Sequence, residues 1–211
     1  MTNILVVDDS PFIVDIFVIM LEQAGYTVES ADGGLTALEK LKTFRPELIM
    51  LDIIMEPMDG WETLLAIKQD PNLKDIPVMM LTAKQITPYE AEAYTIYIED
   101  YILKPITQQD LYTAVESILT RLKNTTDGME LGRKNGYPEP MIQEYARLAH
   151  LATISKRLIK LLESAYQYED IPNQLSGDIK TVTDRMSQNL TFQNERVKEL
   201  RELFAKPNTK T

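Results

Sequence analysis

The strongest constraint on the fold is the alternation, over the first 123 residues, of short strand-like segments with amphipathic segments. Strands are predicted at 4–7, 27–31, 48–51, 77–81 and 101–103, and helices at 11–24, 34–44, 60–69, 87–97 and 107–123. Most of these strands are uninterrupted apolar runs, which indicates a sheet buried on both faces. Strands alternating with helices and joined by right-handed crossovers predict an α/β fold, with a five-stranded parallel sheet doubly wound by five helices.

Polar side chains follow four of these strands. Asp8 and Asp9 follow the first strand, Asp52 the third, Thr82 the fourth and Lys104 the fifth. Because the carboxyl ends of parallel strands meet at one edge of a sheet, we expect these side chains to converge. Three carboxylates repel each other unless a cation intervenes, and Mg²⁺ suits carboxylates, waters and phosphate oxygens. The pattern therefore predicts a place to stabilise a phosphoryl group, with one carboxylate as nucleophile.

The motifs at these strand ends resemble the receiver domain of two-component response regulators. They are VVDD at 6–9, LDIIMEPMDG at 51–60, LTA at 81–83 and DYILKP at 100–105. Each motif alone is weak, but all four stand at strand ends in the family's order. The resemblance covers residues 1–123 and implies a flavodoxin-like fold, phosphorylation by a sensor histidine kinase, and autophosphorylation and autodephosphorylation rather than metabolic catalysis.

The resemblance also implies a role for each matching residue. Asp52 matches the phosphoacceptor. Asp8, Asp9, Asp52 and the backbone carbonyl of Ile54 match the Mg²⁺ ligands. Ile54 occupies, in addition, a position that tunes the lifetime of the phosphoryl group in this family.

The remaining matches concern the switch that reads the phosphoryl group. Thr82 matches the hydroxyl that moves toward it, Tyr101 the aromatic ring that changes rotamer, and Lys104 the lysine that pairs with a phosphoryl oxygen. Lys84 holds the second lifetime-tuning position. Lys104–Pro105 resembles a Lys-Pro dipeptide that is often joined by a cis bond, which proline permits at low cost.

Two segments depart from the family pattern. Glu56 stands where the family often has proline, and Pro57 follows one place later. This change adds negative charge and reshapes the loop after Asp52. Tyr97-Ile98 replaces the usual Gly-Ala before the fifth strand, which makes that part of the helix 4–strand 5–helix 5 face bulkier and more apolar.

The composition changes after the receiver-like segment. Residues 124–140 hold three glycines and two prolines, which predicts a linker or an irregular docking segment. Residues 141–205 follow a helical period with a break at 170–177, and indicate an α-helical hairpin. Its apolar stripe is too wide for one partner helix, so we expect dimerisation into a four-helix bundle or docking of an output protein. Residues 206–211 are predicted to be a frayed tail.

His150 supports an alternative function, because phosphorelay proteins carry a phosphorylatable histidine on a helical hairpin. The acidic neighbour expected for such a histidine is missing, since Leu151 follows it, and no kinase-like ATP-binding segment comes after. A relay role for His150 therefore ranks below a response regulator that signals through its helical region.

Charge and composition bear on the class of partner. Residues 1–121 carry a net charge of −12 and residues 122–211 a net charge of +2, so the charge does not favour binding to nucleic acid, and a DNA-binding output ranks lowest. The N-terminus has no basic signal region, and no apolar run approaches the ~20 residues of a spanning helix. With no cysteine in the chain, we expect a cytoplasmic protein that does not contact membranes.

Overall fold

The computed structural model describes residues 2–165 and 173–208. The chain divides into two compact units. The first comprises residues 1–85 and 97–114, and the second comprises residues 86–96 and 115–211. The helix that includes residues 114 and 115 is continuous, so the division falls within a helix rather than in a loop.

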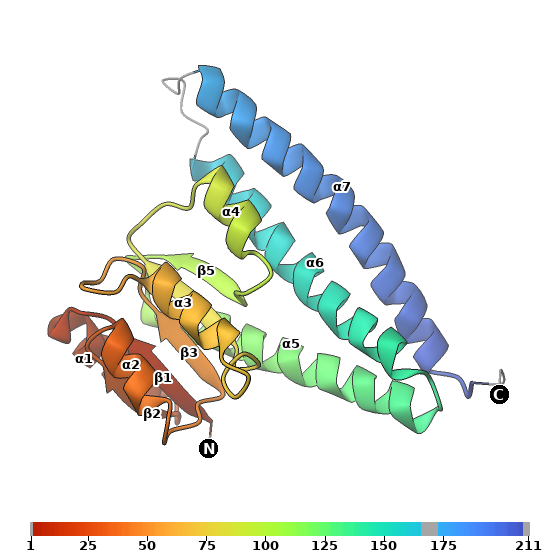
Figure 1. The fold of residues 1–211 in the computed structure, drawn as a ribbon, viewed down its shortest axis with the longest axis horizontal. Coiled ribbons are helices and arrows are strands. Elements are labelled where there is room, and N and C mark those ends of the chain that lie inside the picture. The colour runs from red at the N-terminus through yellow and green to blue at the C-terminus, as the bar shows by residue number, and fades with distance from the viewer. Residues whose placement is uncertain (1, 166–172, 209–211) are drawn as a thin grey trace. The chain divides into compact units, whose positions relative to one another are not determined.

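The first unit is built on one five-stranded parallel sheet in the order β2-β1-β3-β4-β5 (Figure 1). Its strands are β1 (Asn3–Val7), β2 (Thr27–Ala31), β3 (Leu48–Leu51), β4 (Val78–Thr82) and β5 (Asp100–Leu103). Every residue of β3 and β4 is buried, which explains their uninterrupted apolar sequence. The register aligns Val7 of β1 with Leu51 of β3, so neighbouring strands end together. The predicted fold class is confirmed.

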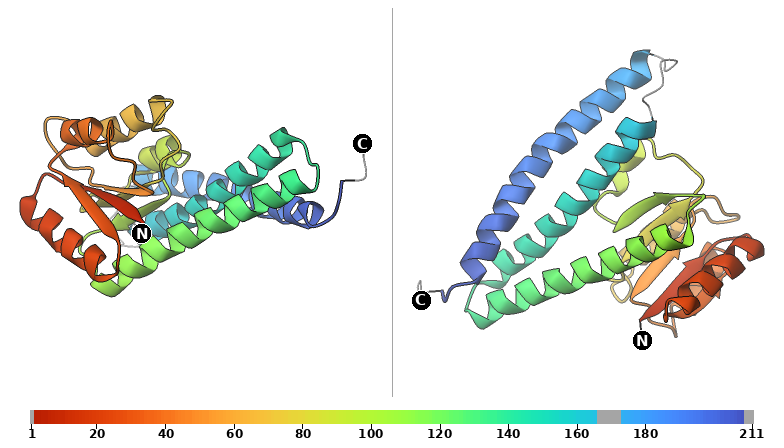
Figure 2. Two further views of the ribbon diagram at one scale, coloured as in Figure 1. Left: turned by 90° about the horizontal axis from the view of Figure 1, so that it is seen from below. Right: turned by 180° about the vertical axis from the view of Figure 1, so that it is seen from behind.

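Helices cover both faces of this sheet. They are α1 (Pro11–Gln23), α2 (Gly34–Lys40), α3 (Gly60–Gln69) and the beginning of α5 (Gln108–Lys134). Figure 2 shows α1 and the beginning of α5 on one face and α2 and α3 on the other. On the first face, the Tyr112 hydroxyl of α5 donates a hydrogen bond to the carbonyl of Met20 in α1. The sheet is therefore doubly wound.

The second unit is helical. It contains α4 (Pro88–Tyr94), the rest of α5, α6 (Glu139–Ala165) and α7 (Asn173–Phe204). Figure 2 shows α6 and α7 running side by side in opposite directions, as expected for a helical hairpin. Arg196 of α7 forms a two-pronged ion pair with Glu144 of α6, which lowers the pKa of Glu144. Arg185 of α7 pairs with Glu92 of α4 at 2.9 Å.

The predicted linker at 124–140 is wrong as a description of local structure. The helix α5 continues through residue 134, and α6 begins at Glu139. Gly128 and Gly132, which suggested a break, are instead places of close packing. A Cβ atom at Gly128 would lie 2.7 Å from the Tyr145 ring, and one at Gly132 would lie 3.1 Å from the Phe204 ring. Glycine here removes a side chain so that an aromatic ring can approach the helix.

The aromatic rings that these glycines admit belong to the core of the second unit. Ile142, Tyr145, Leu200 and Phe204 form a buried cluster. The rings of Tyr145 and Phe204 meet edge to face with centroids 5.6 Å apart, a favourable aromatic geometry. Since α5 supplies Met129 to the same cluster, the part of α5 after residue 123 belongs to the packed core of the second unit.

The predicted frayed tail is also wrong for residues 206–208. The backbone N–H of Asn208 donates to the Asn135 carbonyl at 2.9 Å, and its side-chain amide donates to the Gly136 carbonyl at 2.9 Å. Residues 209–211 lie outside the described residues. Residues 170–172 of the predicted break at 170–177 also lie outside the described residues. From Asn173 the chain is helical, so residues 173–177 do not form the predicted break. The domain limits 1–123 and 141–205 stay a prediction.

Candidate functional site

Three carboxylates meet at the carboxyl edge of the sheet. Asp8 follows β1 and is 3% exposed, and Asp52 follows β3 and is 7% exposed. Asp9 is exposed. Each of the three offers a carboxylate oxygen, and these oxygens lie within 4.8 Å of one another. The strand-end argument therefore places these residues correctly, two of them buried and the third open to solvent.

Backbone hydrogen bonds hold the two buried carboxylates in place. The N–H of Ser10 donates to Asp8 Oδ1 at 2.9 Å. The N–H of Ile53 donates to Asp52 Oδ1 at 2.8 Å, and the N–H of Asp52 donates to the Val7 carbonyl at 2.9 Å. Asp52 is thus fixed to the sheet by its main chain and oriented by the next residue, which leaves Oδ2 as its less engaged oxygen.

Lys104 lies beside both buried carboxylates. Its ammonium group donates a hydrogen bond to Asp8 Oδ2 and lies 3.5 Å from Asp52 Oδ2. It also lies 5.9 Å from the centroid of the Phe17 ring, within the range of a cation–π contact. The side chain of Lys104 is only 16% exposed. One half-buried ammonium therefore offsets part of the negative charge of three carboxylates.

The residues present fit a hard divalent cation. Three carboxylates and one lysine leave a formal charge of −2 in a small volume, and a cation would relieve their repulsion. All the acidic ligand atoms are oxygens, which Mg²⁺ prefers, and exposed Asp9 leaves one side open for the waters that Mg²⁺ retains. Ile54 follows Asp52 by two residues, and its side chain is exposed between the buried residues Ile53 and Met55. The role of its carbonyl as a ligand stays a prediction.

Thr82 and Tyr101 are joined through the backbone of Lys84. Thr82 is fully buried, and its Oγ1 accepts a hydrogen bond from the Lys84 N–H at 3.2 Å. The Tyr101 hydroxyl donates to the Lys84 carbonyl at 2.6 Å. The buried Tyr101 ring stacks on Trp61 with centroids 6.3 Å apart. A displacement of the Thr82 hydroxyl can therefore reach Tyr101 through a single residue.

The structure shows the conformation of the two proline bonds near the site and the burial of Glu56 and Ile98, which depart from the family pattern. The Lys104–Pro105 bond is cis, as the family resemblance implied, and Glu56–Pro57 is cis as well. Glu56 is exposed, and Ile98, one of the residues replacing Gly-Ala, is fully buried.

Two neighbours of the site were not singled out from the sequence as part of it. Phe17 lies under Lys104, and Trp61 packs against Tyr101. Both are apolar residues at helical spacing, a pattern that identifies them only as core. Trp61 is the single tryptophan of the chain and comes soon after Asp52. This position was the sequence signal that could have placed Trp61 near the site.

His150 belongs to α6 of the second unit and is half-buried. Its surroundings in the described residues add no feature that favours phosphorelay, so that role stays a prediction. No helix within residues 2–165 and 173–208 is both long and apolar enough to cross a bilayer.

Comparison with known proteins gives two family matches along the chain. Residues 4–116, more than half of the chain, match the family described as "Response regulator receiver domain". Residues 121–208 match the family described as "Metanogen output domain 2".

Individual relatives are also named as regulators. The chain is 34% identical over 121 residues to the DNA-binding dual master transcriptional regulator RpaA of Synechocystis, covering 57% of this chain and only 50% of that relative. It is 29% identical over 207 residues to the response regulator SaeR of Staphylococcus aureus, covering 88% and 90%. Among solved structures, the response regulator TrrA from Thermotoga maritima, in complex with Mg²⁺-BeF, has a TM-score of 0.50. It is 30% identical, covering 56% of this chain and 99% of that structure.

Proposed function

We propose that this chain, which belongs to the response regulator receiver family, is a signalling protein whose state is set by phosphorylation of Asp52. The observation that carries this proposal is the buried Asp52 carboxylate, which lies beside Lys104 and two further aspartates at one sheet edge. A sensor histidine kinase is the proposed donor, since receiver domains act with such kinases. The relatives are named regulators rather than enzymes, and turnover here is limited to gain and loss of the phosphoryl group.

The chemistry follows from how Asp52 is held. Its Oδ1 accepts from the Ile53 N–H, so Oδ2 is the proposed nucleophile. Oδ2 attacks phosphorus, the bond from phosphorus to the donor's nitrogen or oxygen breaks, and the donor leaves with that electron pair. Asp8, Asp9, Asp52 and the Ile54 carbonyl would hold Mg²⁺, which would supply positive charge to the phosphoryl oxygens. The Lys104 ammonium, beside Asp8 and Asp52, would neutralise further charge.

The proposed readout uses the bridge between Thr82 and Tyr101. When the Thr82 hydroxyl turns to a phosphoryl oxygen, it gives up the hydrogen bond from the Lys84 N–H. The backbone at Lys84 is then free to move, and with it the carbonyl that holds the Tyr101 hydroxyl. Phosphorylation thereby biases a two-state element. Exposed Ile54 and half-buried Lys84 are proposed to tune the lifetime of the phosphoryl group.

Phosphorylation is expected to depend on Mg²⁺. The full chain incubated with acetyl phosphate and Mg²⁺ should gain one acyl phosphate, because the three carboxylates disfavour a phosphate donor unless a cation neutralises them. Removing Mg²⁺ with EDTA should slow labelling by at least about tenfold, and excess Mg²⁺ should restore it. Intact-mass spectrometry measures the product. Labelling at an unchanged rate in EDTA would contradict the proposed metal site.

The helical second unit is proposed to deliver the output by homodimerisation or by docking a partner protein. Phe192 of α7 is a large apolar side chain that is 63% exposed, so α7 keeps an apolar position available after pairing with α6. The helix 4–strand 5–helix 5 face is a second proposed contact. Its elements belong to different units, so this face stays a prediction.

Dimerisation is expected to respond to the phosphorylated state. Sedimentation equilibrium of the full chain should give a higher mass with beryllofluoride and Mg²⁺ than without, since beryllofluoride imitates the phosphoryl group. Phe192→Ser should reduce the dimer fraction if the hairpin forms the contact, by about tenfold in the association constant for a buried aromatic side chain. An unchanged mass for the native chain in both states would exclude homodimerisation as the output.

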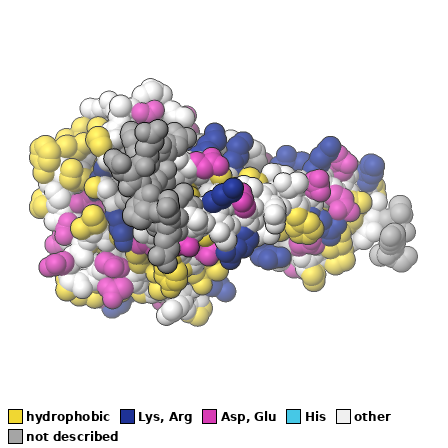
Figure 3. All heavy atoms as spheres, turned by 90° about the horizontal axis from the view of Figure 1, so that it is seen from above, with side chains coloured by type: hydrophobic (Ala, Val, Ile, Leu, Met, Phe, Trp, Pro, Cys, Tyr) yellow, Lys and Arg dark blue, Asp and Glu magenta, His cyan; other side chains and the backbone are white. Residues whose placement is uncertain are grey.

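A DNA-binding output is the second candidate, because RpaA is named a DNA-binding transcriptional regulator. The match to RpaA covers 57% of this chain. Figure 3 shows basic and acidic side chains interspersed on the displayed face, rather than one continuous basic surface. The main proposal for the output therefore stays a protein partner. We also propose that this chain acts in the cytoplasm.

A further inference from the structure

We propose that Trp61 is a positioning residue of the switch, which holds the ring of Tyr101 and connects it to the segment that carries Asp52. This inference rests on the phosphorylation of Asp52 proposed above. The Trp61 and Tyr101 rings are stacked, with centroids 6.3 Å apart and an interplanar angle of 26°. Trp61 is only 6% exposed, and Tyr101 is fully buried. All three residues belong to the first unit, and the stack joins α3 to β5.

Tyr101 is held at two points by two different segments of the chain. Its hydroxyl donates a hydrogen bond to the Lys84 carbonyl at 2.6 Å, in the segment that follows β4. Its ring lies against Trp61, in the segment that follows β3. Thr82 ends β4 and Asp52 directly follows β3, so both segments start at the phosphorylation site. Tyr101 therefore has a second connection to this site, which does not pass through Lys84.

The segment that carries Trp61 is packed directly against the main chain of Asp52. The Gly60 N–H donates a hydrogen bond to the Ile53 carbonyl at 2.9 Å. A Cβ atom at Gly60 would lie only 2.0 Å from the Asp52 carbonyl oxygen. A capping box at Asp59 orders the first turn of α3, which includes Trp61. A displacement of the Asp52 main chain is therefore passed on to Trp61.

Stacking gives Trp61 an effect that an ordinary core residue at its position would lack. A leucine there would also be buried, but stacked aromatic rings attract each other beyond the area that they bury. This additional attraction is enough to shift a two-state equilibrium by about two- to tenfold. The stack exists in one arrangement of Tyr101 and is lost when the ring turns away. Trp61 therefore biases the balance between the two arrangements of the switch, in addition to filling the core.

Substitution of Trp61 in the full chain, with beryllofluoride binding followed by fluorine NMR, tests the proposal. Trp61→Leu removes the aromatic ring and should change the apparent affinity for beryllofluoride with Mg²⁺ by at least about threefold. Trp61→Phe keeps an aromatic ring against Tyr101 and should stay within about twofold of the native chain. Ile67→Ala is the matched control, because Ile67 is a buried residue of the same helix, about 9 Å further along its axis. This control should also stay within about twofold.

The fluorescence of Trp61 gives a second readout, because it is the single tryptophan of the chain. Beryllofluoride with Mg²⁺ should change its emission in the native chain. Tyr101→Phe keeps the ring and removes only the hydroxyl, so the change in emission should persist. Tyr101→Leu removes the stacked ring, so the change should fall by at least about twofold. A merely structural role of Trp61 would leave the same change in emission in both Tyr101 variants, and that result would overturn the proposal.

These experiments separate the role of Trp61 from that of Asp52. Weaker binding of beryllofluoride by Trp61→Leu assigns the stack to the phosphorylated arrangement of Tyr101, and tighter binding assigns it to the unphosphorylated one. An unchanged affinity in Trp61→Leu, or an equal change in Trp61→Leu and Ile67→Ala, would overturn the role of Trp61. If the native chain then binds beryllofluoride and Asp52→Asn does not, the proposed function still stands. Absence of binding to the native chain would overturn both the proposed function and this inference.

Discussion

Asp52→Asn is expected to abolish phosphorylation of the chain while its fold persists. Asparagine has the same shape, and its amide oxygen can accept the hydrogen bond that the Ile53 N–H donates to Asp52 at 2.8 Å. An amide is not a nucleophile toward phosphorus, so labelling from acetyl phosphate with Mg²⁺ should fall by at least about 100-fold. Intact-mass spectrometry and circular dichroism measure the label and the fold.

A matched control for this substitution lies on the same loop. Asp59 caps α3 by accepting a hydrogen bond from the Glu62 N–H at 2.8 Å. Asparagine caps helices about as well as aspartate. Asp59→Asn therefore makes the same chemical change close to the site, and should keep labelling within about twofold of the native chain. Equal labelling of the native chain and Asp52→Asn would refute Asp52 as the phosphoacceptor.

The sheet and the side chains at its edge are predictable from sequence for one physical reason. Parallel strands buried on both faces must be apolar along their length, so a carboxylate such as Asp52 at the end of such a run is conspicuous. Chain order then places the ends of the strands together. The contacts of Phe17 and Trp61 with this edge are not predictable in this way. An apolar residue at helical spacing carries no mark of which polar group it will touch.

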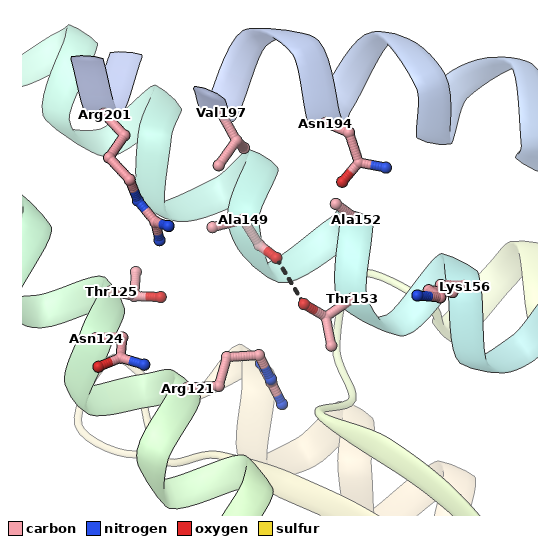
Figure 4. Close-up of a pocket in the computed structure, with 10 residues that line it drawn as sticks. All are labelled: Arg121, Asn124, Thr125, Ala149, Ala152, Thr153, Lys156, Asn194, Val197 and Arg201. Carbon is pink, nitrogen blue, oxygen red and sulfur yellow. Dashed lines mark hydrogen bonds between the residues drawn. The ribbon is translucent and has the colours of Figure 1, made fainter. Parts of the chain in front are cut away.

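The second unit was harder to predict because a glycine can either interrupt a helix or, inside a helix, allow a neighbouring side chain to pack closely. Gly128 and Gly132 resemble breaks in a pattern, yet both lie inside α5 beneath the rings of Tyr145 and Phe204. Those partners are distant in sequence, and only the folded chain brings them to the glycines. The same holds for a cavity in the second unit that Arg121, Lys156 and Arg201 line (Figure 4), since each comes from a different helix. Local patterns identify helices, but not the side chains that they bring together.

Gly60→Ala is expected to distort the loop that holds Asp52 and to destabilise the first unit. A Cβ atom at Gly60 would lie 2.0 Å from the Asp52 carbonyl oxygen and 2.7 Å from the Ile53 Cα. Both are backbone atoms, so the conflict cannot be relieved by a rotamer change, and the loop must move. Gly60 also donates its N–H to the Ile53 carbonyl at 2.9 Å. We expect a loss of about 2–4 kcal/mol in the free energy of unfolding, as for severe overpacking.

Urea unfolding followed by tryptophan fluorescence isolates this effect, because Trp61 is the single tryptophan and adjoins Gly60. Gly177→Ala is the matched control. Gly177 is exposed in α7, and a Cβ atom there would meet nothing within 4 Å. It should gain about 0.5–1 kcal/mol from helix propensity, measured by circular dichroism. Since the distorted loop carries Asp52, phosphorylation of Gly60→Ala under folding conditions should also slow by at least about tenfold. Native stability and a native labelling rate in Gly60→Ala would show that the loop is not the rigid mount of Asp52.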